Sequence, residues 1–464
     1  MSFDSLRYLL FLPTVCALHW LLPARLRWVL LLEASYVFYA SWDAPLSLLI
    51  LAVTAAAYFS ALLLERSASP RVRKCCLTAA LMLPLGLLGY FKYADLLGRT
   101  VSAITGGTWN ALNVVLPVGV SFYTFQAISY VVDVYRGKMK AERHFGYFAL
   151  YIAFFPQLVA GPIERAGALL PQLKAQRRLT RGDITSGLRL LASGYFRKLV
   201  IADLIAPFVD AVYGAALPDG SAVLCATLLF AVQIYCDFSG YSEIALGSAR
   251  LLGVRLMRNF DRPYGAANIR EFWRRWHISL TVWLTDYVYI PMGGSRRGLA
   301  RQLAATLTVF ALCGLWHGAE WSFVMWGLLH ALTMAAYTLL HRRFRGGGMG
   351  ERALTLMAVC FAWLFFRAEN LPHALLLLRQ LLSPWHVSAG LALLMNAAPF
   401  HARLPVLLWL LAGMLAMLRR LPLLTEEGHS VSDPAWAALL LSIVIAALIR
   451  ISAGMTNTFI YFQF

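Results

Sequence analysis

The chain has 464 residues, of which 60% are hydrophobic and 14% are charged, and its formal net charge is +18. Soluble domains have about 45–50% apolar and about 25% charged residues, so this composition excludes a soluble globular protein. The basic residues cluster in short loops between apolar runs, which is typical of a multi-pass membrane protein and not of a nucleic-acid-binding one. Some of these arginines could instead meet an anionic donor in the cytosol.

The apolar runs predict an all-α polytopic membrane protein. One span needs about 20 residues, so the apolar content allows roughly ten or eleven transmembrane helices. No soluble stretch is long enough for an independent domain, and we predict one membrane-embedded domain over residues 1–464. The seven cysteines show no metal-ligand spacing and lie almost entirely in apolar runs, so we expect buried hydrophobic side chains and no metal site.

The first four spans are expected at residues 6–22, 28–42, 45–64 and 75–91. Basic residues occupy the loops at 23–27 and 65–74, which two spans separate. Both loops can therefore lie in the cytosol, which places the N-terminus outside. The N-terminus lacks a basic leader and a small-residue cleavage site, so it is expected to be a retained first span.

Three middle segments carry polar residues where a lipid-facing helix would not. Residues 117–134 are apolar but contain Ser, Thr, Gln and Tyr, which favours a helix packed inside the bundle or lining a cavity. Residues 154–164 contain Pro156, Gly161 and Pro162, which break a helix. A broken segment at membrane depth must be buried in protein or line a cavity. The apolar helix at 184–209 carries four charges and is either interfacial or protein-packed.

A polar cluster follows the long apolar run that begins at residue 221. Its candidate residues are Asp237, Ser239, Tyr241 and Glu243. They could line a tunnel or orient a histidine, or they could form a satisfied polar helix junction.

Residues 259–298 are dense in arginine and tryptophan and end in a basic turn. The segment 269–284 is too polar to span a bilayer, so we predict an interfacial or re-entrant helix that contains His277. Arg274 and Arg275 in this segment could hold the phosphates of a donor or anchor the helix at the interface.

His317 is the main candidate functional residue. No charge occurs from residue 303 to Trp316, and a helix rising about 1.5 Å per residue places His317 roughly 24 Å from the basic turn. That depth is past the middle of a hydrocarbon core about 30 Å thick. An ionisable side chain there is costly unless it faces a polar cavity or a partner.

The helices expected at 300–316 and 321–340 form a pair that turns at residues 317–320. Both ends away from this turn are basic, at 296–301 and 341–345, so both can be cytosolic and His317 lies towards the far side. The last spans are expected at 351–366, 405–418 and 435–449.

Four stretches resemble the membrane-bound O-acyltransferase (MBOAT) family, in particular its bacterial branch of polysaccharide acetyltransferase subunits. They are FFPQLVAGPIER at 154–165, QIYCDFSGYSEIALG at 233–247, NFDRPYGAANIREFWRRWHISLTVWLTDYVYIPMGGSR at 259–296 and LWHGAEWSFVMWGLLHA at 315–331. The closing FIYFQF at 459–464 also matches that branch. The motif-rich core is therefore 154–331. Small departures from the branch pattern occur at Glu243, Asp261 and Thr285, away from the histidines.

The resemblance implies a ring of transmembrane helices, with re-entrant or interfacial helices, around a central tunnel. It implies acyl transfer to a hydroxyl, with His317 as the essential histidine of the family and His277 as a second histidine of the bacterial branch. Neutral imidazole would act as general base, which apolar surroundings favour, and a transient acyl-histidine is the alternative. His277 could take part in catalysis or have a structural role. Trp316 could line the tunnel or pack against neighbouring helices.

The function implied is relay of acetyl from a cytosolic thioester, acetyl-CoA, across the bacterial inner membrane to an exported polysaccharide such as alginate. No bound cofactor is expected. The expected partners are a periplasmic acetyl-acceptor or transferase protein, the exopolysaccharide machinery and the lipid bilayer. The alternatives are a D-alanyl or lipid O-acyltransferase of the same family, or a transporter without chemistry. A transporter would more often show matched broken helices in two pseudo-symmetric halves, which this sequence lacks.

Overall fold

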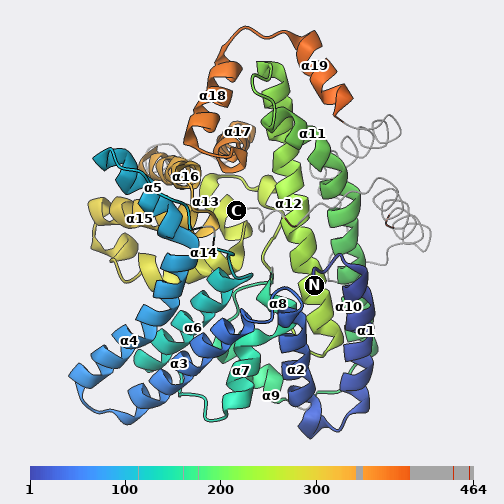
Figure 1. Cartoon of the computed structure of the whole chain (residues 1–464), viewed down its shortest axis with the longest axis vertical. Coiled ribbons are helices and arrows are strands. Elements are labelled where there is room, and N and C mark those ends of the chain that lie inside the picture. The colour runs from blue at the N-terminus through green and yellow to red at the C-terminus, as the bar shows by residue number, and fades with distance from the viewer. Residues whose placement is uncertain are drawn as a thin grey trace. The chain divides into compact units, whose positions relative to one another are not determined.

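A computed structural model describes residues 1–112, 114–159, 161–175, 177–340 and 348–397, together with residues 443 and 459. Within these ranges the chain forms helices and no β-strand (Figure 1). The predicted all-α class is confirmed. The expected spans at 405–418 and 435–449, the basic end at 341–345 and, except for Phe459, the closing motif at 459–464 lie outside the described residues.

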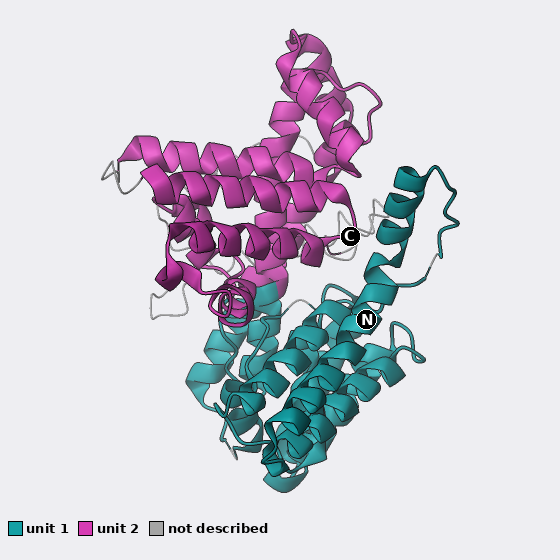
Figure 2. Ribbon diagram, turned by 90° about the vertical axis from the view of Figure 1, so that its left-hand side faces the viewer, with its two compact units in different colours: residues 1–191, 242–258 teal, residues 192–241, 259–464 magenta. Residues whose placement is uncertain are grey.

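The chain forms two compact units (Figure 2). The first unit contains Met1–Leu191 and Ser242–Arg258, and the second contains Ala192–Tyr241 and Asn259–Phe464. Helix α12 (Gly220–Leu251) contributes its first part to the second unit and its last part to the first. The expectation of one functional membrane domain stays a prediction.

The first unit is built around α6 (Val120–Tyr135), which is buried along nearly its whole length and packs against α3 and α4. This burial explains how a helix rich in Ser, Thr, Gln and Tyr is accommodated, since its polar groups meet protein and not lipid. The other helices of this unit are α1 (Leu6–Leu21), α2 (Arg27–Ala40), α3 (Ser47–Arg66), α4 (Pro70–Leu88), α5 (Ala94–Thr105), α7 (Phe145–Ala153), α8 (Phe155–Leu158), α9 (Ala166–Lys174) and most of α10 (Arg181–Tyr195).

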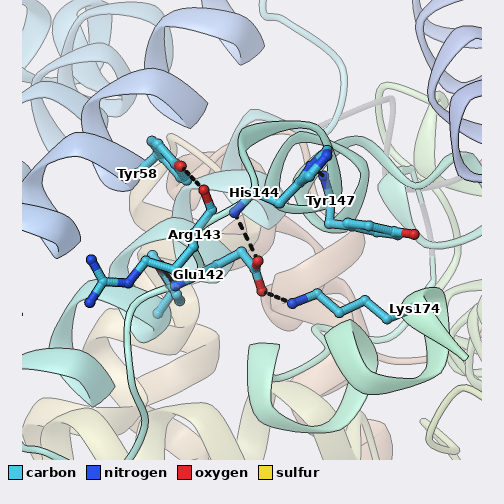
Figure 3. A network of polar contacts seen from close by, with 7 residues as sticks. Tyr58, Glu142, Arg143, His144, Tyr147 and Lys174 are labelled. Atoms are coloured by element: carbon cyan, nitrogen blue, oxygen red, sulfur yellow. Dashed lines mark hydrogen bonds and ion pairs between the residues drawn. The ribbon is translucent and has the colours of Figure 1, made fainter.

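A polar network fixes the loop between α6 and α7 (Figure 3). The Glu142 carboxylate accepts a hydrogen bond from the His144 N–H at 2.9 Å and forms an ion pair with Lys174 of α9. The Tyr58 hydroxyl of α3 donates to the Arg143 carbonyl at 2.6 Å, and the Tyr130 hydroxyl of α6 accepts from the Glu142 N–H at 2.8 Å. The loop is therefore tied to three helices at once. Apart from Lys174, the residues of this network precede the motif-rich core at 154–331.

The helix break predicted at 154–164 is present. Helix α7 ends at Ala153, α8 lasts only four residues, and Phe154–Leu158 are fully buried. Backbone groups at the break have partners in the protein. The Tyr151 carbonyl accepts from the Gln157 side-chain amide at 2.6 Å, and the Phe155 N–H donates to the Ser35 hydroxyl at 3.1 Å. This segment meets the requirement that irregular backbone be buried in protein.

The second unit contains the end of α10, a π-helical segment (Phe196–Ala202), α11 (Asp203–Tyr213), the first part of α12, α13 (Ile269–Arg275), α14 (Ile278–Leu284), α15 (Leu299–His317), α16 (Trp321–Leu340), α17 (Met349–Arg367), α18 (Leu371–Leu382) and α19 (Val387–Asn396). Helix α16 packs against both α15 and α17. The expected single helix at 184–209 is interrupted by the π segment, and the expected helix at 269–284 is two short helices that meet at Trp276 and His277.

Six helices in the described residues are long and apolar enough to cross a membrane: Ser47–Arg66, Pro70–Thr105, Gly220–Leu251, Leu299–His317, Trp321–Leu340 and Met349–Arg367. The helices Leu6–Leu21, Leu371–Leu382 and Val387–Asn396 are shorter and also apolar. The polytopic membrane class is confirmed. The ring around a central tunnel stays a prediction.

Candidate active site

His317 ends α15, and close backbone contact between α15 and α16 sets its position. A Cβ at Gly314 would lie 2.2 Å from the Phe323 carbonyl oxygen, and a Cβ at Gly327 would lie 2.1 Å from the Phe310 carbonyl oxygen. Only glycine therefore allows this approach at both crossing points. The predicted turn of the helix pair after His317 is confirmed, and the imidazole is buried.

His277 lies at the junction of α13 and α14 in an unusual backbone conformation. Its φ and ψ are 43° and 54°, in the left-handed region that side chains other than glycine rarely adopt. Asn259 holds the start of α14, because its backbone carbonyl accepts from the Ile278 N–H at 2.9 Å and its side-chain oxygen accepts from the Ser279 hydroxyl at 2.6 Å. Such a strained residue persists only where its surroundings fix it.

The structure brings the two predicted histidines together. The centroids of the His277 and His317 rings are 6.1 Å apart. Trp316 contacts both, at 5.5 Å from His277 and 5.0 Å from His317, with its plane steeply inclined to each. Among the described residues, neither ring nitrogen of His277 has a hydrogen-bond partner. Ring packing therefore orients the His277 imidazole.

Aromatic side chains surround the His317 imidazole. Its ring lies edge-on to Trp326 at 5.0 Å and to Phe366 at 5.3 Å, between centroids. These residues come from α16 and α17, so three helices meet at the imidazole. Such an apolar wall limits hydration of the base and strengthens electrostatic interactions at the site. The arrangement suits proton transfer from a hydroxyl that enters beside the two histidines.

Comparison with known proteins identifies the family. The sequence model described as "MBOAT, membrane-bound O-acyltransferase family" matches residues 140–371. A probable alginate O-acetylase AlgI of Azotobacter vinelandii is 39% identical over 382 residues, which cover 80% of this chain and 76% of the relative. A probable alginate O-acetylase AlgI of Pseudomonas putida is 35% identical over 492 residues and covers 100% of both chains. A peptidoglycan O-acetyltransferase of Helicobacter pylori is 35% identical over 384 residues, 76% of this chain and 72% of that protein.

The chain belongs to the membrane-bound O-acyltransferase family. It is an O-acyltransferase and a multi-pass membrane protein.

Helix α12 of this acyltransferase contacts His277 through Phe238, which lies between the predicted residues Asp237 and Ser239. Phe238 packs edge-on against His277, with 4.7 Å between ring centroids. Asp237, the residue before it, forms an ion pair with Lys198 at 2.7 Å, and the Ser239 hydroxyl accepts from the Arg197 guanidinium at 3.1 Å. Tyr241 stacks on Phe459 at 4.1 Å. Glu243 belongs to the first unit.

The two arginines of α13 differ in their surroundings. The Arg275 guanidinium is 2.5 Å from the Glu271 carboxylate on the same helix, which neutralises part of its charge. Arg274 is exposed, and the neighbouring Arg270 lies over the Tyr337 ring at 5.2 Å. Arg274 is therefore the better placed of the two to meet an anionic group. No cluster of three or more His, Cys, Asp and Glu side chains that could hold a metal ion occurs in the part of the acyltransferase that the structure describes.

Sequence reasoning missed three residues that support the histidines or their neighbours: Lys198, Phe238 and Asn259. In the sequence, Lys198 and Asp203 stand out only as charges in an apolar helix. That signal was available, because a charge within an apolar helix is costly unless it is paired. Nothing in the local sequence marks Asn259 as the residue that fixes the backbone after His277.

Proposed function

We propose that this acyltransferase moves an acetyl group from a cytosolic thioester, acetyl-CoA, to an exported polysaccharide such as alginate. The observation that carries the proposal is the buried pair of His277 and His317, brought together from two separate motifs. The relatives named alginate O-acetylase, which align with most or all of the chain, support the choice of acetyl and of alginate.

His317 is proposed as the general base. Its neutral imidazole takes the proton from the acceptor hydroxyl as that oxygen attacks the thioester carbonyl carbon. A C–O bond forms and the C–S bond breaks. The imidazolium then returns the proton to the departing thiolate, so CoA leaves as the free thiol and the histidine is again neutral. In the alternative route, His317 would first take the acetyl group from the thioester as a transient acyl-histidine, and the acceptor hydroxyl would then take it from the histidine. This route needs two transfers in place of one.

His277 is proposed to position the acceptor hydroxyl beside His317, with Trp316 packed against both rings. Its ring nitrogens are available for the acceptor, because no described residue hydrogen-bonds to them. Asp237, Ser239 and Tyr241 are proposed to hold the part of α12 that packs against His277. Arg274 and, once released from Glu271, Arg275 are candidates for the donor phosphates.

The enzyme is proposed to act in the bacterial inner membrane, with a donor funnel on the cytosolic face and the acceptor beyond the opposite face. A periplasmic protein would receive the acetyl group or complete its transfer within the exopolysaccharide machinery. The matching peptidoglycan O-acetyltransferase keeps a second acceptor open, since its identity of 35% equals that of the full-length alginate relative. The names of both relatives give acetyl as the group transferred.

The first experiment replaces His317 by alanine in an alginate-producing host and measures acetyl ester on the exported polymer. Loss of a general base lowers the rate by roughly 100-fold or more, so we expect the ester to disappear while the protein stays in the membrane. His19→Ala is the matched control, because His19 is a buried histidine of an apolar helix in the other unit. It should leave acetylation unchanged.

Two outcomes would overturn different parts of the proposal. Full acetylation by the His317→Ala protein would make His317 a packing residue and remove the mechanism. The wild-type protein could instead yield no acetylated alginate in membranes that still release free CoA from acetyl-CoA. That result would overturn alginate as the acceptor and would support acetyl-CoA as the donor.

A further inference from the structure

A buried ion cluster lies close to the histidines in the second unit and consists of Lys198, Asp203 and Asp237. The Lys198 ammonium nitrogen is 2.8 Å from an Asp203 oxygen and 2.7 Å from an Asp237 oxygen. All three side chains are at most 6% exposed. Burial of charged groups costs free energy of desolvation, which hydrophobic side chains of similar volume would not cost. Stabilisation of the fold is therefore a weak explanation for this Lys198 cluster, and we expect a functional one.

The cluster sits where two helical segments touch at backbone level. A Cβ at Gly240 of α12 would lie 2.8 Å from the Gly194 carbonyl oxygen and 3.1 Å from the Lys198 backbone nitrogen. Lys198 itself lies in the π-helical segment between α10 and α11. A π-helical turn shifts the following side chains relative to a regular helix and is frequent at functional sites. Here it places one lysine between an aspartate of α11 and an aspartate of α12.

Asp237 connects the cluster to the active site through the next residue. Phe238 packs on the His277 ring at 4.7 Å with an interplanar angle of 83°. Because described residues make no hydrogen bond to the His277 ring nitrogens, the imidazole depends on such ring contacts for its orientation. Rotation of α12 by a small angle would move Phe238 away from this edge-on contact. The ion pair between Lys198 and Asp237 opposes that rotation.

We propose that Lys198 and Asp237 are positioning residues: their buried ion pair fixes α12 so that Phe238 holds the His277 imidazole for the reaction. The cation of Lys198 also lies 5.5 Å from the centre of the Tyr241 ring, which is one turn further along α12. Two residues on the same face of the helix therefore contact the lysine. The inference rests on the proposed function, because it assigns a support to the role of His277 argued above.

Two isosteric variants separate positioning from general stabilisation. Asp237→Asn and Asp203→Asn each remove one carboxylate charge from the same lysine and leave the other paired with it. Only Asp237 belongs to α12. We expect Asp237→Asn to lower kcat about ten-fold or more with KM for acetyl-CoA changed less than about two-fold, since displacement of an acceptor-positioning group by a fraction of an ångström slows chemistry without weakening donor binding. Asp203→Asn should keep kcat within about two-fold.

The assay uses the full chain in permeabilised cells of an alginate-producing host, which retain the periplasmic partner, with radiolabelled acetyl-CoA and rates divided by the amount of folded protein. Phe238→Leu leaves the ion cluster intact and tests the link directly, should Asp237→Asn fail to fold. We expect it to lower kcat as Asp237→Asn does. The double variant should lose little more than either single one, because both changes act through one contact.

The outcomes distinguish failure of this inference from failure of the proposed function. Equal kcat in Asp237→Asn, Asp203→Asn and wild type, with His277→Ala inactive, would overturn the positioning role alone. Equal loss of kcat in both aspartate variants would also overturn it, because a general electrostatic or stability effect would then suffice. Full activity of His277→Ala would remove the role of His277, and the inference would fall with it.

Discussion

The backbone at His277 shows how one residue is held in a strained conformation near the site. Its left-handed φ of 43° is maintained from both sides, by Asn259 on the backbone that follows and by Phe238 and Trp316 on the ring. Strain of this kind is stored where the geometry of a side chain matters. We therefore expect Asn259 to affect activity as well as stability.

Replacing Asn259 by alanine tests this influence. The change removes the acceptor for Ser279 and leaves the buried start of α14 without a cap, which costs about 1 kcal/mol and allows His277 to relax. We expect acyl transfer to fall roughly ten-fold or more while the protein remains folded. Asn370→Ala is the matched control, because Asn370 caps α18 by accepting from the His373 N–H at 2.9 Å. Equal activity of the two variants would show that Asn259 acts only on stability.

At the scale of single residues, the sequence predicts ionisable residues that stand in apolar segments, where burial costs free energy. It misses residues whose role depends on a contact with a part of the chain that is distant in sequence. His317 was predictable because it ends a charge-free helix. Phe238 was not, because phenylalanine is ordinary in an apolar helix and its contact with His277 depends on tertiary packing. Asp237 was predicted as a candidate site residue. Its ion pair with Lys198 was not, because it depends on the π-helical turn, which no local sequence pattern predicts.

At the scale of elements, the hairpin of α15 and α16 sets the depth and direction of His317. The two helices were predicted from their apolar runs and basic ends, and they are confirmed. The close crossing at Gly314 and Gly327 was not predicted, because a glycine in an apolar helix is equally compatible with an open position. The break of 269–284 at His277 was missed for a related reason, since arginine and tryptophan favour a continuous amphipathic helix.

Substitution at the crossing point tests the hairpin. In Gly314→Ala the new methyl group would lie 2.2 Å from the Phe323 carbonyl oxygen, so the two helices must separate. Overpacking of this kind costs about 1–3 kcal/mol and moves His317, which ends the same helix. We expect a lower melting temperature in detergent and a loss of acyl transfer larger than the loss of folded protein explains.

Gly86→Ala is the matched control for that prediction. Gly86 lies in α4, another apolar helix, and a Cβ there has no neighbour within 4 Å. Alanine is the better helix former by up to about 1 kcal/mol, so the variant should be as stable as wild type or slightly more stable, and fully active. If Gly314→Ala behaves like Gly86→Ala, the crossing is wider than the structure shows and does not position His317.

At the scale of the whole molecule, the distribution of charge predicts which ends of the helices face the cytosol. The exposed Arg296 and Arg297 precede α15, and the basic stretch at 341–345 follows α16. By the positive-inside rule we expect both on the cytosolic side and the turn after His317 on the other side. Helix α17 is then expected to return across the membrane, with α18 and α19 on the external side. This orientation decides from which side donor and acceptor can reach the histidines.

Labelling of single cysteines with a membrane-impermeant maleimide tests the orientation. Ser295 lies in the exposed basic turn and Ser388 is exposed in α19, so a cysteine at either position can react. The exposed native Cys75 is first replaced by serine to lower the background. We expect Ser388→Cys to be labelled in intact spheroplasts and Ser295→Cys only in inverted vesicles. The reverse pattern would turn His317 towards the cytosol, and the acceptor rather than the donor would then have to cross most of the membrane to reach it.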